Sequence, residues 1–176
     1  EGRCQRVPNR RRCTHDPAAA GLTARDAERS ATPVVMTGGA TLNAFLVEDN
    51  EETCRVLVEA MEVLTSVRFM GVATDEVSAS QWLQARAGEW DLAIVDLILA
   101  DGNGLGVLKA CQQRGPMQKV VVLTGHVDEG ILQRCRELGA DQVFDKNLDI
   151  ENLVDYCRVH ATYLGFMQDH GIVAGG

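Results

Sequence analysis

Apolar and polar residues change along the chain in short blocks that have two different spacings. Strand-like blocks, with continuous or alternating apolar residues, cover 42–49, 67–73, 91–99, 119–124 and 142–145. Blocks in which apolar residues recur every three or four positions, as in a helix, cover 51–64, 76–89, 104–114, 129–139 and 150–164. Each strand-like block is followed by a helical one, so the pattern predicts five successive βα units.

The predicted strands 91–99 and 119–124 are nearly continuous apolar runs. Such runs are typical of parallel strands that are covered by helices on both faces. Right-handed crossovers and a switch in strand order then favour an α/β fold with a doubly wound, five-stranded parallel sheet. In such a fold the functional crevice lies at the carboxyl ends of the strands.

The first 35 residues differ in composition from the rest. They hold seven Arg, four acidic residues and three of the four Pro, but none of the eight aromatic residues. So few apolar side chains cannot offset the entropy lost on ordering. We therefore expect a disordered N-terminal arm over 1–40, a folded domain over 41–166 and a C-terminal tail over 167–176.

Charge and cysteine content limit the possible functions. The whole chain carries −8 and the first 35 residues carry +3, so residues 36–176 carry −11. Such an acidic body suits cations or basic partners better than a nucleic-acid backbone. The six cysteines form no Cys-x-x-Cys pair, which favours free thiols in a reducing cytoplasm over disulfides or zinc. No apolar run reaches membrane-spanning length.

Polar residues stand where the predicted strands end. Glu48 and Asp49 end the first strand, Asp96 interrupts the apolar run LAIVDLIL, Thr124 ends the fourth strand and Lys146 follows the fifth. These side chains should meet at one edge of the sheet. Three carboxylates at close range repel one another more than one lysine can offset. A hard divalent cation can offset them, and Mg²⁺ prefers oxygen ligands.

A divalent cation with an ammonium and a hydroxyl nearby is the arrangement that phosphoryl transfer requires. Asp96 is then the candidate nucleophile, which would form an aspartyl phosphate. Taken singly, a buried aspartate, a strand-end threonine and a lysine each have ordinary structural explanations. Their occurrence in phase on successive βα units favours the functional interpretation.

The segments FLVEDN, IVDLILADGNG, VVLTG and LGADQVFDK, in this order, resemble the receiver domains of two-component response regulators. The resemblance covers about residues 42–165 and implies a flavodoxin-like strand order 2-1-3-4-5. It implies that Asp96 accepts a phosphoryl group from a phosphohistidine and that Thr124 and Lys146 contact the phosphoryl oxygens. Gly125 would leave room for the phosphoryl group.

The same resemblance implies the ligands of a Mg²⁺ cofactor. Asp49, Asp96 and the main-chain carbonyl of Ile98 would bind Mg²⁺ directly, and Glu48 would bind it through water.

The chain departs from the family pattern at three positions. Asn147 follows the lysine, where the family often has a proline with a cis bond, and Ala100 replaces a common loop proline. Val143 occupies the position of the switch aromatic, while the neighbouring Phe144 should face the other side of the strand. We therefore expect an activation signal that does not run through a buried aromatic.

The favoured function is a stand-alone receiver that acts as a phosphorylation switch or relay in two-component signalling. It would catalyse only its own phosphorylation and dephosphorylation and would otherwise not be an enzyme. The expected partners are a sensor histidine kinase or a histidine phosphotransfer protein and an unknown downstream protein. No DNA-binding domain is expected, because no room for a helix-turn-helix remains after residue 165, and no membrane contact is expected.

Two other functions use the same fold. One is a protein-interaction module that signals without phosphorylation, which the altered position at Val143 favours and the intact acidic set disfavours. The other is a flavodoxin-like cofactor binder. That function requires a loop that cradles phosphate after the first strand, whereas VEDNEET offers carboxylates.

Overall fold

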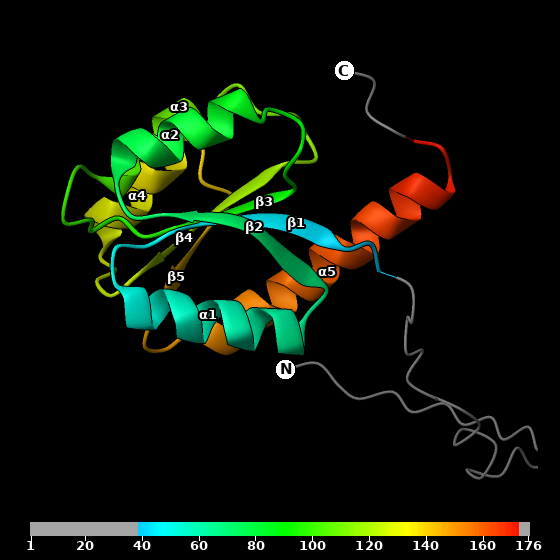
Figure 1. Ribbon diagram of the computed structural model, residues 1–176, viewed down its shortest axis with the longest axis horizontal. Coiled ribbons are helices and arrows are strands. Elements are labelled where there is room, and N and C mark those ends of the chain that lie inside the picture. The colour runs from blue at the N-terminus through cyan, green and yellow to red at the C-terminus, as the bar shows by residue number, and fades with distance from the viewer. Residues whose placement is uncertain (1–38, 173–176) are drawn as a thin grey trace, which may run out of the picture. The chain divides into compact units, whose positions relative to one another are not determined.

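The structure is a computed structural model that describes residues 39–172. All ten predicted elements occur in the predicted order (Figure 1). The strands are β1 (Leu42–Val47), β2 (Val67–Ala73), β3 (Leu92–Val95), β4 (Lys119–Thr124) and β5 (Gln142–Asp145). The helices are α1 (Glu51–Leu64), α2 (Glu76–Ala85), α3 (Gly104–Ala110), α4 (Glu129–Glu137) and α5 (Ile150–Asp169). The predicted arm lies almost entirely outside the described residues.

The five strands form one parallel sheet in the order β2-β1-β3-β4-β5. This order confirms the predicted doubly wound, flavodoxin-like fold. The order reverses at β1, so the chain first builds outward to β2 and then crosses over β1 to β3. The carboxyl ends of β1 and β3 consequently lie side by side at the topological switch point, where such folds bind ligands.

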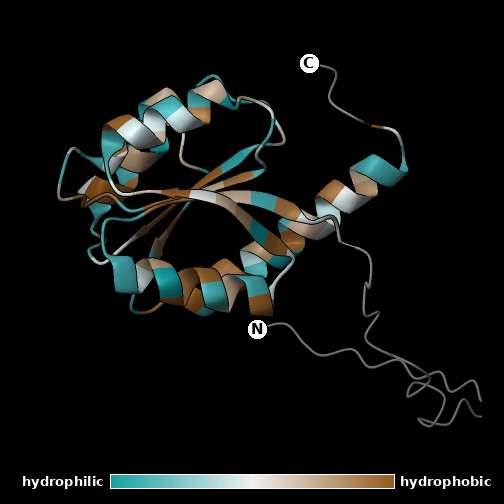
Figure 2. Cartoon of the chain, viewed as in Figure 1, coloured by the Kyte–Doolittle hydropathy of each residue, from teal (hydrophilic) through white to brown (hydrophobic). Residues whose placement is uncertain are grey.

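The sheet separates two apolar cores (Figure 1). Helices α1 and α5 cover one face, and α2, α3 and α4 cover the other. Successive strand residues alternate between the two cores, as Phe45 and Leu46 do in β1 and Val122 and Leu123 do in β4. Figure 2 shows mostly apolar strands lying between helices that carry both apolar and polar residues. The uninterrupted apolar runs in the sequence follow from this burial on both faces.

Four helices begin directly at the carboxyl edge of the sheet with a side-chain cap. Asn50, Asp75, Asn103 and Asp128 each accept a hydrogen bond from a backbone N–H of the following helix, at 2.8–2.9 Å. Such caps satisfy N–H groups that have no partner within the helix. They fix where α1, α2, α3 and α4 begin, and so fix the loops that surround this edge.

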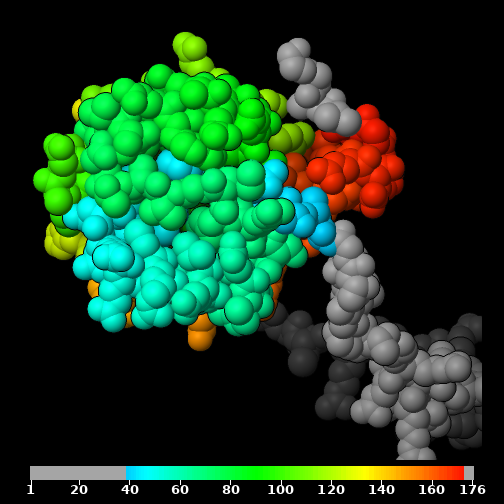
Figure 3. Space-filling view, in the orientation of Figure 1, coloured from blue at the N-terminus to red at the C-terminus, as the bar shows by residue number. Residues whose placement is uncertain are grey.

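Several predicted element ends differ from the structure: β1, α2, α3 and α4 end two to four residues before the predicted blocks do, and the ends of β3 and α5 differ for reasons of local geometry. Strand β3 ends at Val95 because the chain turns after Asp96 into a loop in which Ile98 pairs with Asn103. The apolar residues Leu97 and Leu99 are buried, although they belong to this loop and not to a strand. Helix α5 continues past residue 164 to Asp169 and closes before Gly171, which has a φ of +65°. Figure 3 shows this last part of α5, in red, extending beyond the packed strands and helices.

None of the helices in residues 39–172 is both long enough and apolar enough to cross a membrane.

His160 is buried in α5, and its Nε2 has no hydrogen-bond partner among the described residues. Burial lowers the pKa of His160 below 6.5, and the charge of Lys119 acts in the same direction, whereas Asp91 and Asp141 oppose the shift. The folded protein therefore binds fewer protons at this site than the unfolded chain. The contribution of His160 to the free energy of unfolding is therefore fully present above pH 6.5 and is lost as the pH falls below it.

We predict that His160→Leu reduces the loss of unfolding free energy between pH 7 and pH 5, because the variant has no imidazole to charge. The contribution of one proton is at most about 1.4 kcal/mol per pH unit. Urea unfolding at several pH values measures the slope. His126→Gln, which removes an exposed histidine, should keep the wild-type slope. Equal slopes for wild type and His160→Leu would contradict the prediction.

Candidate functional site

The strand register places the predicted acidic residues next to one another. Val47 is paired with Val95 in the parallel ladder between β1 and β3, so Glu48 and Asp96 are the next residues on adjacent strands. The backbone continues the ladder for one step, since Asp96 N donates to Val47 O at 2.9 Å. Asp49 follows on the first strand and lies at the rim.

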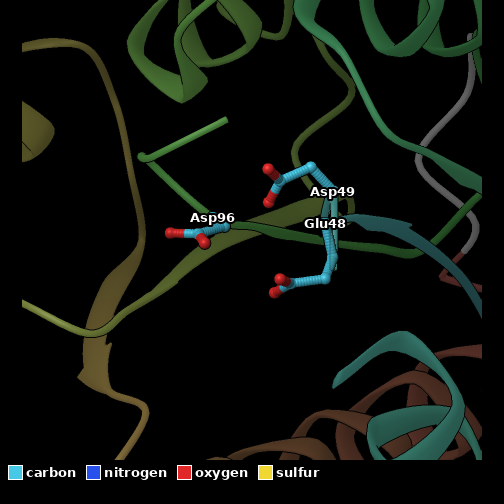
Figure 4. A group of neighbouring side chains, drawn as sticks. All are labelled: Glu48, Asp49 and Asp96. Carbon is cyan, nitrogen blue, oxygen red and sulfur yellow. The ribbon is translucent and has the colours of Figure 1, made fainter. Parts of the chain in front are cut away.

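The carboxylates of Glu48, Asp49 and Asp96 converge at this edge (Figure 4). One oxygen from each lies within 4.8 Å of the others. Glu48 and Asp96 are only 2% and 6% exposed, whereas Asp49 is half-buried. Hard oxygen donors at this spacing fit a small divalent cation. We call Glu48, Asp49 and Asp96 the acidic cluster.

Lys146 pairs with the two buried carboxylates. Its Nζ lies 2.5 Å from Glu48 Oε2 and 2.5 Å from Asp96 Oδ2. Burial lowers the pKa of Lys146, but the hydrogen bonds and charges of Asp96 and Glu48 outweigh it, and the net pKa is raised. The lysine is therefore charged. One ammonium against three carboxylates leaves about two negative charges, which a divalent cation would neutralise.

Backbone amides orient the acidic cluster. Ile98 N donates to Asp96 Oδ1 at 3.1 Å, and Ala100 N donates to Asp49 Oδ2 at 2.9 Å. This role of Ala100 is not apparent from the sequence, in which the residue stands out only as the replacement of a common loop proline. Proline has no N–H, so this hydrogen bond requires the replacement. No sequence signal links Ala100 to Asp49, because the contact depends on how the loop folds back.

The loop after β3 approaches its own helix closely at Gly104. A Cβ at this position would lie 2.1 Å from Asp96 O and 2.8 Å from Leu97 Cα. Only glycine allows this approach. The loop thereby brings Ile98 to the edge of the acidic cluster, where the residue is 64% exposed.

Thr124 lies at the end of β4 with its hydroxyl buried. Oγ1 has no hydrogen-bond partner among the described residues, although a buried hydroxyl without a partner is costly. Next to it, a Cβ added to Gly125 would meet nothing within 4 Å. A buried donor without a partner and open space beside it fit an oxygen-rich group that enters at this edge.

The side chains of β5 face as the sequence predicts. Val143 is half-buried and packs against the core under α4, while Phe144 is buried against α5, with its ring centroid 5.9 Å from that of Tyr156. The peptide bond between Lys146 and Asn147 is trans. The lysine therefore reaches the acidic cluster without the cis bond that often accompanies a following proline.

The family model described as "Response regulator receiver domain" matches residues 44–158. The chain belongs to this family. The sequence-based resemblance is confirmed, as is the assignment of the domain to two-component signalling.

Several known proteins are similar to this receiver domain in sequence or in structure. The photosynthetic apparatus regulatory protein RegA of Cereibacter sphaeroides is 33% identical over 119 residues, which cover 68% of this chain and 62% of RegA. Among solved structures, a DNA-binding response regulator of the LuxR family from Staphylococcus aureus has a TM-score of 0.61 at 17% identity, covering 68% of this chain and 98% of that one.

A third similar structure is a response regulator protein from Burkholderia pseudomallei with a phosphorylated aspartic acid, a calcium ion and citrate. Its TM-score is 0.58 at 21% identity, and the match covers 72% of each chain. At such identities the two structures show that the fold is shared.

The predicted set of partners, which excluded a DNA-binding domain, is wrong. The receiver domain resembles a DNA-binding response regulator, and the chain spans about three fifths of the length of the curated relatives it matches. The two apolar cores are formed by residues of the receiver domain itself. They therefore do not indicate which other domains accompany a receiver domain in a regulator.

We predict that Mg²⁺ stabilises the wild-type domain and that this effect depends on Asp49. At about ten times its Kd, a ligand that binds only the folded state adds about 1.4 kcal/mol, which should raise the melting temperature by several degrees. Asp49→Asn should respond little, because it loses a charge but keeps an oxygen that can accept from Ala100 N. Without Mg²⁺ it should be at least as stable as wild type, because repulsion is relieved.

Thermal unfolding with and without millimolar Mg²⁺ measures both effects. An equal Mg²⁺ response in wild type and Asp49→Asn would rule out cation binding at the acidic cluster.

Proposed function

We propose that the domain accepts a phosphoryl group from a phosphohistidine onto Asp96, in the presence of Mg²⁺, and acts as a phosphorylation switch or relay. The observation that carries the proposal is the arrangement at the sheet edge. Asp96 shares Lys146 with Glu48 and lies next to Asp49. It faces an edge where the buried hydroxyl of Thr124 finds no partner within residues 39–172.

In this reaction a carboxylate oxygen of Asp96 forms a bond to phosphorus while the phosphorus–nitrogen bond of the donor histidine breaks. The amide of Ile98 holds Asp96 Oδ1 at 3.1 Å and so fixes the carboxylate plane during the attack. Formation of the acyl phosphate removes the charge on Asp96 and brings the charged phosphoryl oxygens to the site, so the ammonium of Lys146 can pair with those oxygens instead.

Mg²⁺ is the cation that fits this oxygen-rich site, with Asp49, Asp96 and the carbonyl of Ile98 as ligands and Glu48 acting through water. When bound, it would neutralise the charge of the transferring group and of the carboxylates. The hydroxyl of Thr124 donates to a phosphoryl oxygen and gains the partner that it lacks. The open space at Gly125 admits the phosphoryl group.

The phosphorylated aspartic acid and the calcium ion of the Burkholderia pseudomallei protein support the proposal by likeness of fold. A reducing, cytoplasmic setting is part of the proposal. Cys54, Cys111, Cys135 and Cys157, the cysteines in the described part of the chain, are free thiols. Self-catalysed phosphorylation and dephosphorylation are the only reactions proposed.

We predict that Asp96→Asn abolishes labelling by acetyl phosphate in the presence of Mg²⁺. The variant keeps an oxygen that can accept from Ile98 N but lacks the nucleophile. Intact mass spectrometry measures the label. Asp101→Asn, which neutralises an exposed aspartate of the same loop, should be labelled like wild type. Labelling of Asp96→Asn at another residue would refute the assignment, and no labelling of wild type would favour the phosphorylation-independent module.

We predict that the signal passes through residues 124–132 and not through rotation of Val143, because a β-branched side chain has few rotamers to exchange. Beryllofluoride should shift backbone amide resonances mainly in this range. Thr124→Ala should lose most of these shifts and still be labelled at Asp96, whereas Thr124→Ser, which keeps the hydroxyl, should retain them. A rotamer change at Val143 with residues 124–132 unmoved would refute this route.

A further inference from the structure

Glu76, the first residue of α2, lies outside the acidic cluster but bonds to the loop that follows Asp96. Its Oε2 accepts a hydrogen bond from Asn103 N at 2.8 Å, and its own N–H donates to Asp101 O at 3.3 Å. The preceding residue, Asp75, forms a parallel bridge with Asp101. The start of α2 therefore holds this loop at two points.

One of these points is tied directly to the cation side of the loop. Asn103 pairs with Ile98 in an antiparallel bridge, and the carbonyl of Ile98 is the main-chain ligand in the proposed function. Between them, Ala100 N holds Asp49 Oδ2 at 2.9 Å. A displacement of Asn103 would therefore move both Ile98 and the amide that orients Asp49.

The helix that follows the loop leaves room for the Glu76 carboxylate. A Cβ at Gly106, inside α3, would lie 1.8 Å from Glu76 Oε1. Glycine is unfavourable within a helix, by about 0.5–1 kcal/mol relative to alanine. Gly106 incurs this cost, but the absence of a Cβ leaves the space that the Glu76 carboxylate occupies. Gly102, with a φ of +86°, likewise lies against the side chain of Glu76.

We propose that Glu76 is a positioning residue for the cation site. Through its hydrogen bond to Asn103 N it fixes the loop 97–103 in the geometry that presents the carbonyl of Ile98 and orients Asp49. It acts through the loop and not as a ligand. This inference rests on the proposed function and adds the residue that organises its metal-binding loop.

The test is Mg²⁺ affinity, measured by titration calorimetry on the full chain. Glu76→Ala should weaken Mg²⁺ binding about tenfold, as is typical when an outer group that orients a metal ligand is lost. Glu76→Gln keeps an oxygen that can accept from Asn103 N and should stay within about threefold of wild type. Glu129→Ala is the matched control, because Glu129 is also the first residue of a helix after a capping aspartate. It should bind like wild type.

Gly106→Ala tests the same contact from the other side. Its Cβ would displace the Glu76 carboxylate, so Mg²⁺ binding should weaken as in Glu76→Ala, although alanine favours the helix. The double variant should bind no more weakly than Glu76→Ala alone, because both changes break one hydrogen bond. Additive losses would contradict a shared contact.

The outcomes separate this inference from the proposed function. If wild type and Glu76→Ala bind Mg²⁺ equally, the positioning role is wrong and the proposed function stands. If Glu76→Gln is as weak as Glu76→Ala, the effect is one of charge and the positioning role is also wrong. If wild type itself binds no Mg²⁺, the proposed cation site fails and the positioning role fails with it.

Discussion

The charge imbalance at the carboxyl edge of the sheet is the constraint on which the site depends. Glu48 and Asp96 are buried beside apolar strands, where an unpaired carboxylate would be costly. The ammonium of Lys146 pairs with both and makes their burial tolerable. Among the ion pairs of residues 39–172, it leaves Asp49 without an ionic partner at the rim. Because a buried ion pair often adds little stability, the presence of these groups points to a function.

The strand order determines how Lys146 reaches the two buried carboxylates. Lys146 follows β5, while Glu48 and Asp96 follow β1 and β3, so the lysine side chain must cross the end of β4. It does so because Lys146 N bonds to Thr124 O at 2.9 Å, which fixes the start of the lysine at the last residue of β4. A shift of one residue in this pairing would turn the side chains of β5 to the opposite faces. The ion pairs thus depend on the same register that buries Val143 and Phe144 on opposite sides.

The sequence was sufficient for the fold and for the residues of the acidic cluster, because both depend on periodicity. Alternating blocks gave ten elements in order, and polar residues at strand ends gave Glu48, Asp96 and Lys146. The sequence was insufficient where a contact or an element end depends on how the backbone of a loop folds. Leu97 and Leu99 extend the apolar run and resemble strand, yet the close approach at Gly104 makes their segment a loop. The contacts of Ala100 and Glu76 join backbone amides to residues distant in sequence, and no periodicity reports them.

Nearly all buried polar side-chain atoms in the described part of the domain have hydrogen-bond partners, and one of the two exceptions lies at the proposed site. Only two buried side-chain atoms among residues 39–172 lack a hydrogen-bond partner, Thr124 Oγ1 and His160 Nε2. The histidine can remain neutral, since burial lowers its pKa. The threonine has no such remedy, and it lies at the edge where the acidic cluster carries excess negative charge. In the proposed function, a phosphoryl oxygen would accept the hydrogen bond of the Thr124 hydroxyl. A divalent cation would supply the positive charge that the carboxylates need. Under the proposed function, phosphorylation and cation binding would satisfy both groups, and the unphosphorylated domain would bear the cost of leaving them unsatisfied.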